Sequence, residues 1–117
     1  MKVQNIGIDI VEVKRFRKIP YKKGSVFYSK IFSDAEIKYC LSKTDPAQHF
    51  AARFAAKEAV LKCLRSTIYK VKEIEIVNDK NGAPLVMVHS HRSSSGKFLV
   101  SLSHTHDYAV ATALFVN

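Results

Sequence analysis

The chain has 117 residues, of which 47% are hydrophobic, and these values fit one globular domain over residues 1–117 with a core of its own. The 19 Lys and Arg residues exceed the 10 Asp and Glu residues and give a net charge of +9, so we expect acidic partners. No apolar run reaches the roughly 20 residues of a membrane span, and none follows a basic start, so neither a membrane helix nor a secretion signal is expected.

The chain begins with an alternating pattern that predicts a β-strand over residues 3–13. One face of this strand carries Ile6, Ile8 and Ile10, with Glu12 near its end. The other face carries Asp9, an acid in the middle of a strand, where such residues are uncommon. Gly7 beside it leaves room for another group to come close. The simpler interpretation is an edge strand with Asp9 in water.

Basic residues dominate the next segment, since residues 14–23 contain six Lys and Arg. This run predicts a short helix or turn with a basic outer surface, which is the expected docking surface for an acidic partner. Apolar residues at helical spacing follow over residues 25–32. Ser33 and Glu36 then have the spacing of a capping box, which predicts a helix through about Leu41.

The longest helix is predicted from residue 46 to about residue 65, with Asp45 as N-cap, Pro46 in the first helical position and Gln48 completing a capping box. At about 100° per residue, one arc of this helix forms an apolar stripe that includes a carboxylate and a lysine. The arc holds Ala51, Phe54, Glu58, Leu61, Lys62 and Arg65. The simpler interpretation is a buried helix with an ion pair between Glu58 and Lys62.

The second half of the chain is predicted to be extended. A strand over residues 74–77, a turn over residues 79–82 and a returning strand over residues 85–89 form a hairpin. A polar loop over residues 92–96 precedes two further strands, predicted over 98–102 and 108–116 and joined by residues 103–107. The fold class is therefore α+β, with an antiparallel sheet packed against one long central helix and shorter helices.

Two interpretations of function need no enzyme. His89 with His91, and His104 with His106, have a spacing that on a strand points both rings to one side, as in a structural zinc site. However, no cysteine or carboxylate accompanies them at ligand spacing. The basic run and the aromatic residues near it suggest instead a basic RNA-binding module without enzymatic activity, an interpretation that depends on charge alone.

The residues for nucleophilic catalysis are not in place. Cys40 and Cys63 lack a partner histidine, and we expect both to be reduced and buried in a cytoplasmic protein. The carboxylates Asp9 and Glu58 suggest a different chemistry, because hard oxygen ligands among many cations suit Mg²⁺ holding a pyrophosphate. That combination favours transfer of a phosphoryl-type group.

Two segments, in this order, resemble the signature of the holo-acyl-carrier-protein synthases, the small 4′-phosphopantetheinyl transferases. They are Ile-Gly-Ile-Asp-Ile-Val-Glu at residues 6–12 and Arg-Phe-Ala-Ala-Lys-Glu-Ala at residues 53–59. Further matches are Asn81-Gly82-x-Pro84, Ser103-His104 and Tyr108-Ala109. The resemblance extends from about residue 3 to residue 116 and implies the 4′-phosphopantetheinyl transferase fold.

The resemblance implies an activity. Members of this family transfer the 4′-phosphopantetheine group from coenzyme A to a serine of apo acyl carrier protein and release adenosine 3′,5′-bisphosphate. They are homotrimers with active sites between adjacent subunits, so the expected partners are coenzyme A, acyl carrier protein and two further copies, with no nucleic acid and no membrane. The charge of +9 agrees with a polyphosphate ligand and an acidic partner protein.

The resemblance also implies a set of site residues. Asp9 and Glu58 would hold Mg²⁺ on the diphosphate, and Lys62 would contact a phosphate or stabilise the leaving group, which makes these three the catalytic candidates. The pocket for adenine and the 3′-phosphate would be lined by Arg53, Asn81, Gly82, Pro84 and His104. Arg15 and Lys18 would face the carrier protein. The group that deprotonates the serine stays open between Asp9, a metal-bound water and a residue of the partner.

One segment departs from the family pattern. Residues 65–70 contain no glycine, whereas the family usually has glycines here, whose backbone approaches the phosphates closely. Arg65 and the hydroxyls of Ser66 and Thr67 are the expected substitutes. Activity is still expected, because both metal-ligand candidates and Lys62 are present.

Overall fold

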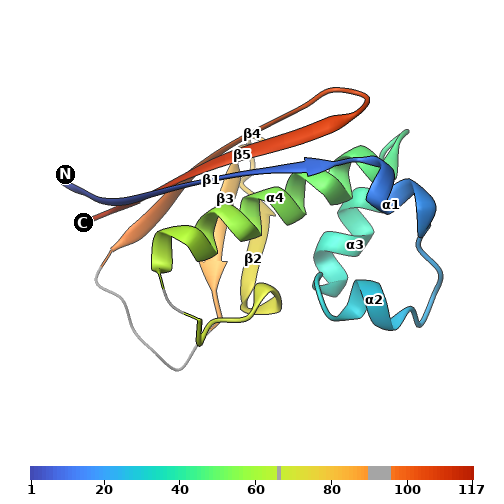
Figure 1. The fold of residues 1–117 in the computed structure, drawn as a ribbon, viewed down its shortest axis with the longest axis horizontal. Coiled ribbons are helices and arrows are strands. Elements are labelled where there is room, and N and C mark those ends of the chain that lie inside the picture. Colours follow the sequence, from blue (N-terminus) through green and yellow to red (C-terminus); the bar gives the residue numbers. More distant parts are fainter. Residues whose placement is uncertain (66, 90–95) are drawn as a thin grey trace.

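The structure is a computed structural model that describes residues 1–65, 67–89 and 96–117. Its elements, in chain order, are β1 (Val3–Glu12), α1 (Lys14–Lys18), α2 (Val26–Ser29), α3 (Asp34–Leu41), α4 (Pro46–Leu64), a 3₁₀ helix (Val71–Glu73), β2 (Ile74–Asn78), β3 (Pro84–Val88), β4 (Lys97–His104) and β5 (Tyr108–Val116) (Figure 1). The predicted α+β class is confirmed. The loop predicted over residues 92–96 lies, apart from Gly96, outside the described residues.

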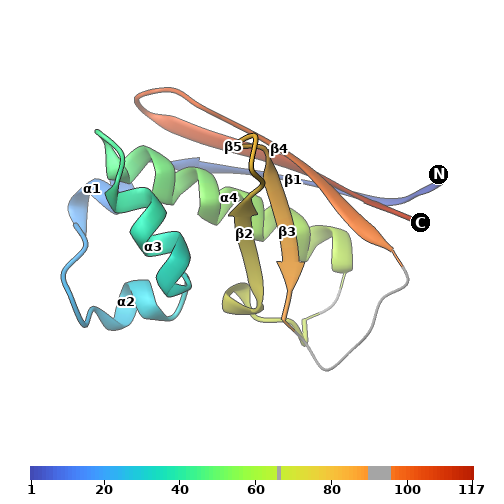
Figure 2. The same ribbon diagram turned by 180° about the vertical axis from the view of Figure 1, so that it is seen from behind.

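The predicted antiparallel strands divide between two sheets that pack on different sides of α4. One sheet has the strand order β1-β5-β4, and the other is the hairpin of β2 and β3. The three long strands run above α4 in Figure 1, while the hairpin crosses the helix on a second side and lies in front of it in Figure 2. Among the described residues, no helix has the length and apolar character needed to cross a membrane.

Strand β1 lies at a sheet edge, as the simpler interpretation has it, but Asp9 does not point into water. The face with Gly7 and Asp9 packs on α4, and the side chain of Asp9 is only 17% exposed. The helix comes this close because Gly7 has no side chain. A Cβ at this position would lie 2.1 Å from the carbonyl oxygen of Ala59 and 3.2 Å from the backbone nitrogen of Cys63.

Replacing Gly7 by alanine should therefore force β1 and α4 apart. Overpacking of this kind costs roughly 1–3 kcal/mol, or more where backbone atoms block relaxation. We expect a lower midpoint in urea unfolding and lower activity, because the movement separates Asp9 from Glu58. The variant Gln4→Ala, at an exposed position of the same strand, is the control. A Gly7→Ala protein as stable as the control would contradict the close approach.

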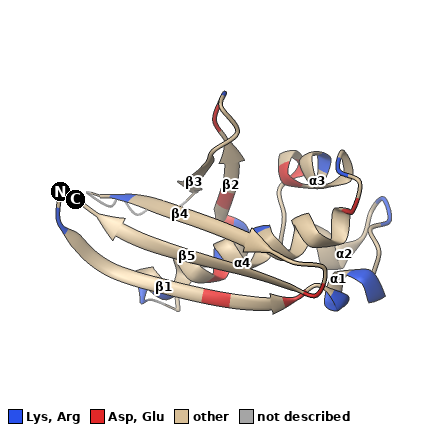
Figure 3. Ribbon diagram, turned by 90° about the horizontal axis from the view of Figure 1, so that it is seen from above, with Lys and Arg blue, Asp and Glu red and all other residues tan. Residues whose placement is uncertain are grey.

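The opposite face of the sheet is apolar and uncovered in the single chain. Ile6, Ile8 and Ile10 are 65%, 59% and 65% exposed. Across the sheet, Ile6 pairs with Leu114 and Leu114 with Leu99, so the apolar face continues onto β5 and β4. Figure 3 looks onto this sheet from above and shows no Lys or Arg along β1 and β5, whereas basic residues lie on α1, on α3 and at the start of β4.

Helix α4 has the predicted position, with Asp45 as N-cap and Pro46 following it. The predicted capping box is wrong, because the side chain of Asp45 makes no capping hydrogen bond and instead accepts two hydrogen bonds from Arg17, at 3.0 and 2.8 Å. The helix ends at Arg65, whose φ of 52° is left-handed, a conformation that favours glycine.

The predicted apolar stripe of α4 also needs correction. Outside the stripe, all positions from Phe50 to Cys63 are buried, whereas within the stripe only Ala51 is buried. Phe54 and Glu58 are partly exposed there, and Lys62 is exposed. The alanines explain the burial, because their small side chains allow the two sheets to come close to the helix on its other faces.

A buried ion pair joins α3, α4 and β2. Lys57 Nζ lies 2.6 Å from Glu36 Oε1, and both side chains are fully buried. Lys57 also donates to the carbonyl of Ile74 at 2.5 Å, while Glu36 accepts the backbone N–H groups of Ser33 and Ile76, each at 2.8 Å. The capping box predicted for Ser33 and Glu36 is thus confirmed, and the same carboxylate holds the second sheet in place.

Both cysteines are free and buried, as predicted. Burial raises the pKa of Cys40 to about 12 and also raises the pKa of Cys63. The thiol of Cys63 donates to the carbonyl of Ala113 at 3.1 Å. Cys40 lies on α3 and Cys63 near the end of α4, so the two thiols report on different parts of the core.

Candidate active site

The contact between β1 and α4 brings the three catalytic candidates together. Lys62 Nζ lies 3.1 Å from Asp9 Oδ1 and donates to the carbonyl of Ile8 at 2.8 Å. The expected ion pair between Glu58 and Lys62 is therefore replaced by one between Lys62 and Asp9. Lys62 is 55% exposed, so this pair stands at the surface, where an arriving anion can reach the ammonium group.

Glu58 lies half-buried beside this pair. Burial and, next, the negative charge of Asp9 raise the pKa of Glu58 above its ordinary value of 4.5, while Lys62 and Arg15 act in the opposite direction. Among the described residues, no hydrogen bond or ion pair engages the Glu58 carboxylate. Two close carboxylates, one of them uncommitted, form an arrangement that a divalent cation stabilises.

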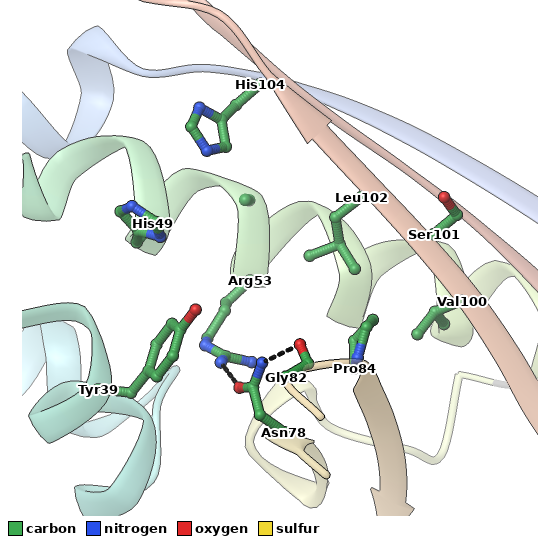
Figure 4. A pocket seen from close by; sticks show the side chains of 11 residues that line it. Tyr39, His49, Arg53, Asn78, Gly82, Pro84, Val100, Ser101, Leu102 and His104 are labelled. Atoms are coloured by element: carbon green, nitrogen blue, oxygen red, sulfur yellow. Dashed lines mark hydrogen bonds between the residues drawn. The ribbon is translucent and has the colours of Figure 1, made fainter. Parts of the chain in front are cut away.

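A cavity of about 300 Å³ lies on the other side of α4, between α3, the hairpin and β4 (Figure 4). Its polar lining residues are Tyr39, His49, Arg53, Asn78, Ser101 and His104. Gly82 and Pro84 of the hairpin also line it, as expected. Asn81 does not, since it lies exposed at the tip of the hairpin, where its backbone N–H bonds to Asp79 at 2.8 Å.

Arg53 is largely committed within the protein. It is 4% exposed, donates from Nη1 to the carbonyl of Ile76 at 2.8 Å, and donates from Nη2 to the side chain of Asn78. Its guanidinium also lies 4.0 Å from the ring centre of Tyr39. Its Nε is also buried and has no hydrogen-bond partner among the described residues.

Four polar lining residues were not predicted from the sequence: Tyr39, His49, Asn78 and Ser101. A signal existed for His49, because it precedes Arg53 by one helical turn and must share its face of α4. The other three have no local signal. They reach the cavity only because α3, the hairpin and β4 fold against the same stretch of α4.

The histidine pairs do not form a metal centre in the part of the chain that the structure describes. His89 bonds to Glu75 at 2.8 Å, and His106 bonds to Asp107 at 3.0 Å. The ring of His104 instead faces that of His49, with 5.2 Å between centroids. No group of three His, Cys, Asp or Glu side chains gathers among the described residues. His91 lies outside them.

The carboxylate cluster and the cavity lie at opposite edges of the three-stranded sheet. Asp9 is on β1 and His104 on β4, with β5 between them, so the two strands are about 10 Å apart. On α4, Glu58 comes five positions after Arg53, which turns their side chains about 140° apart. None of Asp9, Glu58 and Lys62 lines the cavity. Within one chain, the carboxylates and the cavity are therefore separate.

This fold is shared by a known class of enzymes. The sequence pattern of the 4′-phosphopantetheinyl transferase superfamily matches residues 5–113, and the chain belongs to this superfamily. It is 42% identical to the holo-[acyl-carrier-protein] synthase of Chlamydia pneumoniae, over 97% of this chain and 98% of the relative. It is 47% identical to that of Chlorobaculum tepidum, over 94% and 96%. The predicted resemblance, and with it the prediction of an enzyme, is confirmed.

Solved structures bear out the fold. A holo-(acyl-carrier-protein) synthase from Bacillus anthracis, in complex with CoA (3′,5′-ADP), matches with a TM-score of 0.81 and 28% identity, over 97% of this chain and 96% of the other. The holo-[acyl-carrier-protein] synthase of Helicobacter pylori, in complex with coenzyme A, matches with a TM-score of 0.79 and 26% identity, over 95% and 99%.

Proposed function

We propose that this chain is a cytoplasmic, Mg²⁺-dependent enzyme that transfers the 4′-phosphopantetheine group of coenzyme A to a serine of apo acyl carrier protein. The products are holo acyl carrier protein and adenosine 3′,5′-bisphosphate. The observation that carries the proposal is the pair of Asp9 and Glu58, held together by the close β1–α4 contact at Gly7 in a chain of this superfamily. The coenzyme named for two of the similar structures supports it.

Asp9 and Glu58 suit a hard divalent cation. Both offer carboxylate oxygens, and their mutual repulsion contributes to the raised pKa of Glu58. A cation that binds both removes this repulsion, and its remaining positions suit phosphate oxygens and water. When bound, Mg²⁺ supplies positive charge to the diphosphate oxygens and so makes the phosphorus easier to attack.

Lys62 acts on the leaving group. The serine hydroxyl gives up its proton to a base and its oxygen forms a bond to the phosphorus that carries the pantetheine, while the bond from that phosphorus to the bridging oxygen breaks. The bridging oxygen leaves with the nucleotide and gains negative charge. Because Lys62 Nζ stands beside Asp9 on a flexible stem, it can contact this oxygen and stabilise the charge.

We assign the adenine and 3′-phosphate of coenzyme A to the cavity. Its volume of about 300 Å³ is at the lower end of the range for ligand sites, which suits one end of an extended molecule. Its lining contains Arg53 and no carboxylate. Lys43 stands nearby, with Nζ 4.7 Å from the ring centre of Tyr39. The cavity is therefore positively charged and attracts a phosphate.

We further propose a homotrimer in which two half-sites, the carboxylates of one copy and the cavity of another, combine. Within one chain, the carboxylates and the cavity lie at opposite edges of the sheet. The uncovered face with Ile6, Ile8 and Ile10 gives a reason for copies to associate, because covering it removes apolar surface from water.

Mixed trimers test this arrangement. The variants Glu58→Gln and His104→Ala each disable one half-site, so each alone should have little activity. Mixing them after reversible dissociation should restore activity, because some interfaces then combine an intact cavity with intact carboxylates. Mixtures that stay as inactive as the separate variants would contradict the shared site. Light scattering gives the number of copies independently.

The basic helix α1 is the proposed docking surface for the carrier protein. Arg15 and Lys18 are exposed on it, and the guanidinium of Arg15 lies 5.1 Å from the ring centre of Phe54, one helical turn before Glu58. A partner bound to α1 would therefore present its serine near the carboxylates.

Reversing Arg15 and Lys18 to Glu should weaken carrier-protein binding at least about tenfold, with a smaller effect at high salt, and should leave coenzyme A affinity nearly unchanged. The matched control reverses the exposed Lys72 and Lys80. Each substitution replaces a positive charge by a negative one, so the two substitutions in each variant lower the net charge from +9 to +5. Equal losses in the two variants would show that net charge, and not α1, attracts the partner.

The direct test of the reaction is mass spectrometry of an apo acyl carrier protein after incubation with this enzyme, coenzyme A and Mg²⁺. We expect the carrier protein to gain the mass of one phosphopantetheine group and this gain to disappear with EDTA. No gain with several carrier proteins would sink the proposal. The alternative, an RNA-binding module without enzymatic activity, depends on charge alone, and it predicts an RNA affinity that falls steeply with salt and no response to coenzyme A.

A further inference from the structure

His49 is a residue of the cavity to which the proposed function gives no role. It lies on α4, one turn before Arg53, with its ring partly buried. The ring of His104, at the end of β4, approaches it edge-on, with 5.2 Å between centroids and 65° between planes. The ring of Tyr39, on α3, also lies beside His49, with 6.0 Å between the ring centroids. Two imidazoles from different elements thus stand together at one part of the cavity (Figure 4).

The charged groups around His49 are mostly positive. Arg53 shares its helix, Lys43 lies in the α3–α4 connection, and His104 faces it from β4. The one nearby acid is Asp45, whose two carboxylate oxygens are bonded to Arg17 at 3.0 and 2.8 Å. The surroundings of His49 therefore have positive potential and no free carboxylate among the described residues.

These surroundings favour the neutral form of His49 in the free protein. Burial, and then the charges of His104, Lys43 and Arg53, lower the pKa of His49 below its ordinary value of 6.5, while Asp45 acts weakly in the opposite direction. A dianion bound beside the two rings would reverse the balance, because it favours the protonated form of His49. An imidazolium also donates from both ring nitrogens, whereas the neutral ring donates from only one.

We propose that His49, together with His104, binds the phosphate monoester of the nucleotide substrate, and that the histidine pair takes up a proton when this phosphate arrives. The inference rests on the proposed function and adds to it a specificity-determining residue. A monoester is the right class, because its second ionisation near pH 6 makes it a dianion at neutral pH. A diphosphate bridge, with one charge on each phosphate, favours the uptake less.

Arg53 adds positive charge to this part of the cavity. Its Nη1 and Nη2 donate to Ile76 and Asn78 within the protein, and its Nε is buried. Its effect on a phosphate in the cavity is therefore mainly electrostatic.

The test compares coenzyme A with dephospho-coenzyme A, which lacks only the monoester, by isothermal titration calorimetry at constant Mg²⁺. Titrations at pH 7.5 in buffers of different ionisation enthalpy give the number of protons taken up. At this pH the monoester is already a dianion, so proton uptake belongs to the protein. We expect uptake with coenzyme A and none with dephospho-coenzyme A. The affinity for coenzyme A should rise as the pH falls, by at most about tenfold per pH unit for one proton.

The variant His49→Phe isolates the contribution of this ring. It should lose most of the proton uptake and bind coenzyme A about tenfold more weakly at pH 6.5, the loss expected for one charge-assisted hydrogen bond. Its affinity for dephospho-coenzyme A should stay within about twofold of the original. The control His106→Phe changes an exposed histidine outside the cavity and should alter neither quantity.

The outcomes separate the two proposals. If coenzyme A binds and His49→Phe keeps the full proton uptake, or loses affinity for both ligands equally, the role of His49 is refuted while the proposed function stands. If neither ligand binds the unmodified protein, the proposed function fails and the inference fails with it.

Discussion

Replacing Lys57 by methionine should lower the free energy of unfolding by about 3–5 kcal/mol, because it leaves a buried carboxylate without its counter-charge. Lys57 and Glu36 are fully buried and 2.6 Å apart. Burial lowers the pKa of Lys57, and the nearby carboxylate opposes this. Without the ammonium group, Glu36 keeps only the two backbone donors of Ser33 and Ile76. A domain of ordinary stability, about 5–15 kcal/mol, would lose a large part of it.

The midpoint of urea unfolding at constant slope measures this loss. Lys38→Met, which changes an exposed lysine on α3, is the matched control and should cost less than about 0.5 kcal/mol. The double variant Lys57→Met with Glu36→Gln should recover much of the stability, because no uncompensated charge then remains and the glutamine keeps an oxygen acceptor. A double variant no more stable than Lys57→Met would mean that packing, and not charge, sets the cost.

Replacing Glu58, the residue after Lys57, should mainly lower activity, whereas replacing Lys57 mainly lowers stability. Glu58→Gln should reduce Mg²⁺-dependent transfer by about 1,000-fold, the loss that corresponds to several kcal/mol of transition-state stabilisation by a bound cation. The amide keeps the shape of the side chain but removes a charged metal ligand. The control is Glu12→Gln, which makes the same change at an exposed position of β1. Near-normal turnover by Glu58→Gln would refute the metal-ligand assignment.

Without metal, the difference in stability between the unmodified protein and Glu58→Gln should depend on pH in a defined direction. Because the pKa of Glu58 is raised in the folded protein, its ionisation disfavours folding. Below the ordinary value of 4.5 the residue is neutral in the folded and unfolded states, so both proteins should unfold alike. As the pH rises through the raised pKa, the unmodified protein loses stability relative to the variant. Urea midpoints measured from pH 4 to pH 7 would show the two proteins diverging.

Lys57 and Glu58 show which contacts can be predicted from the sequence. The sequence placed Glu58 in a motif, and its partner Asp9 was found because an acid in mid-strand is conspicuous. Lys57 has no such signal, since its partners belong to α3 and to β2. For Glu36 the sequence predicted the local capping box and missed the bond to Ile76, 40 residues further along. Local hydrogen bonds follow from spacing, whereas long-range ones require the packing of the elements.

The faces of β1 illustrate the same limit. Alternation predicted correctly that Ile6 and Asp9 lie on opposite faces, but it did not determine which face meets the helix. The larger side chains would ordinarily be the buried ones. Here the glycine face is buried, because α4 presents alanine backbone and leaves no room for side chains. The exposed isoleucines then support the proposed association of copies.

The reactivity of the two buried thiols can be used to measure local opening of the protein. Only the thiolate reacts with alkylating reagents, and burial with a raised pKa protects both Cys40 and Cys63 in the closed state. Labelling must therefore wait for the surrounding structure to open. The alkylation rate of Cys40 would report the detachment of α3, and that of Cys63 the separation of α4 from β5. Peptide-resolved alkylation rates would therefore show which side of the molecule opens first.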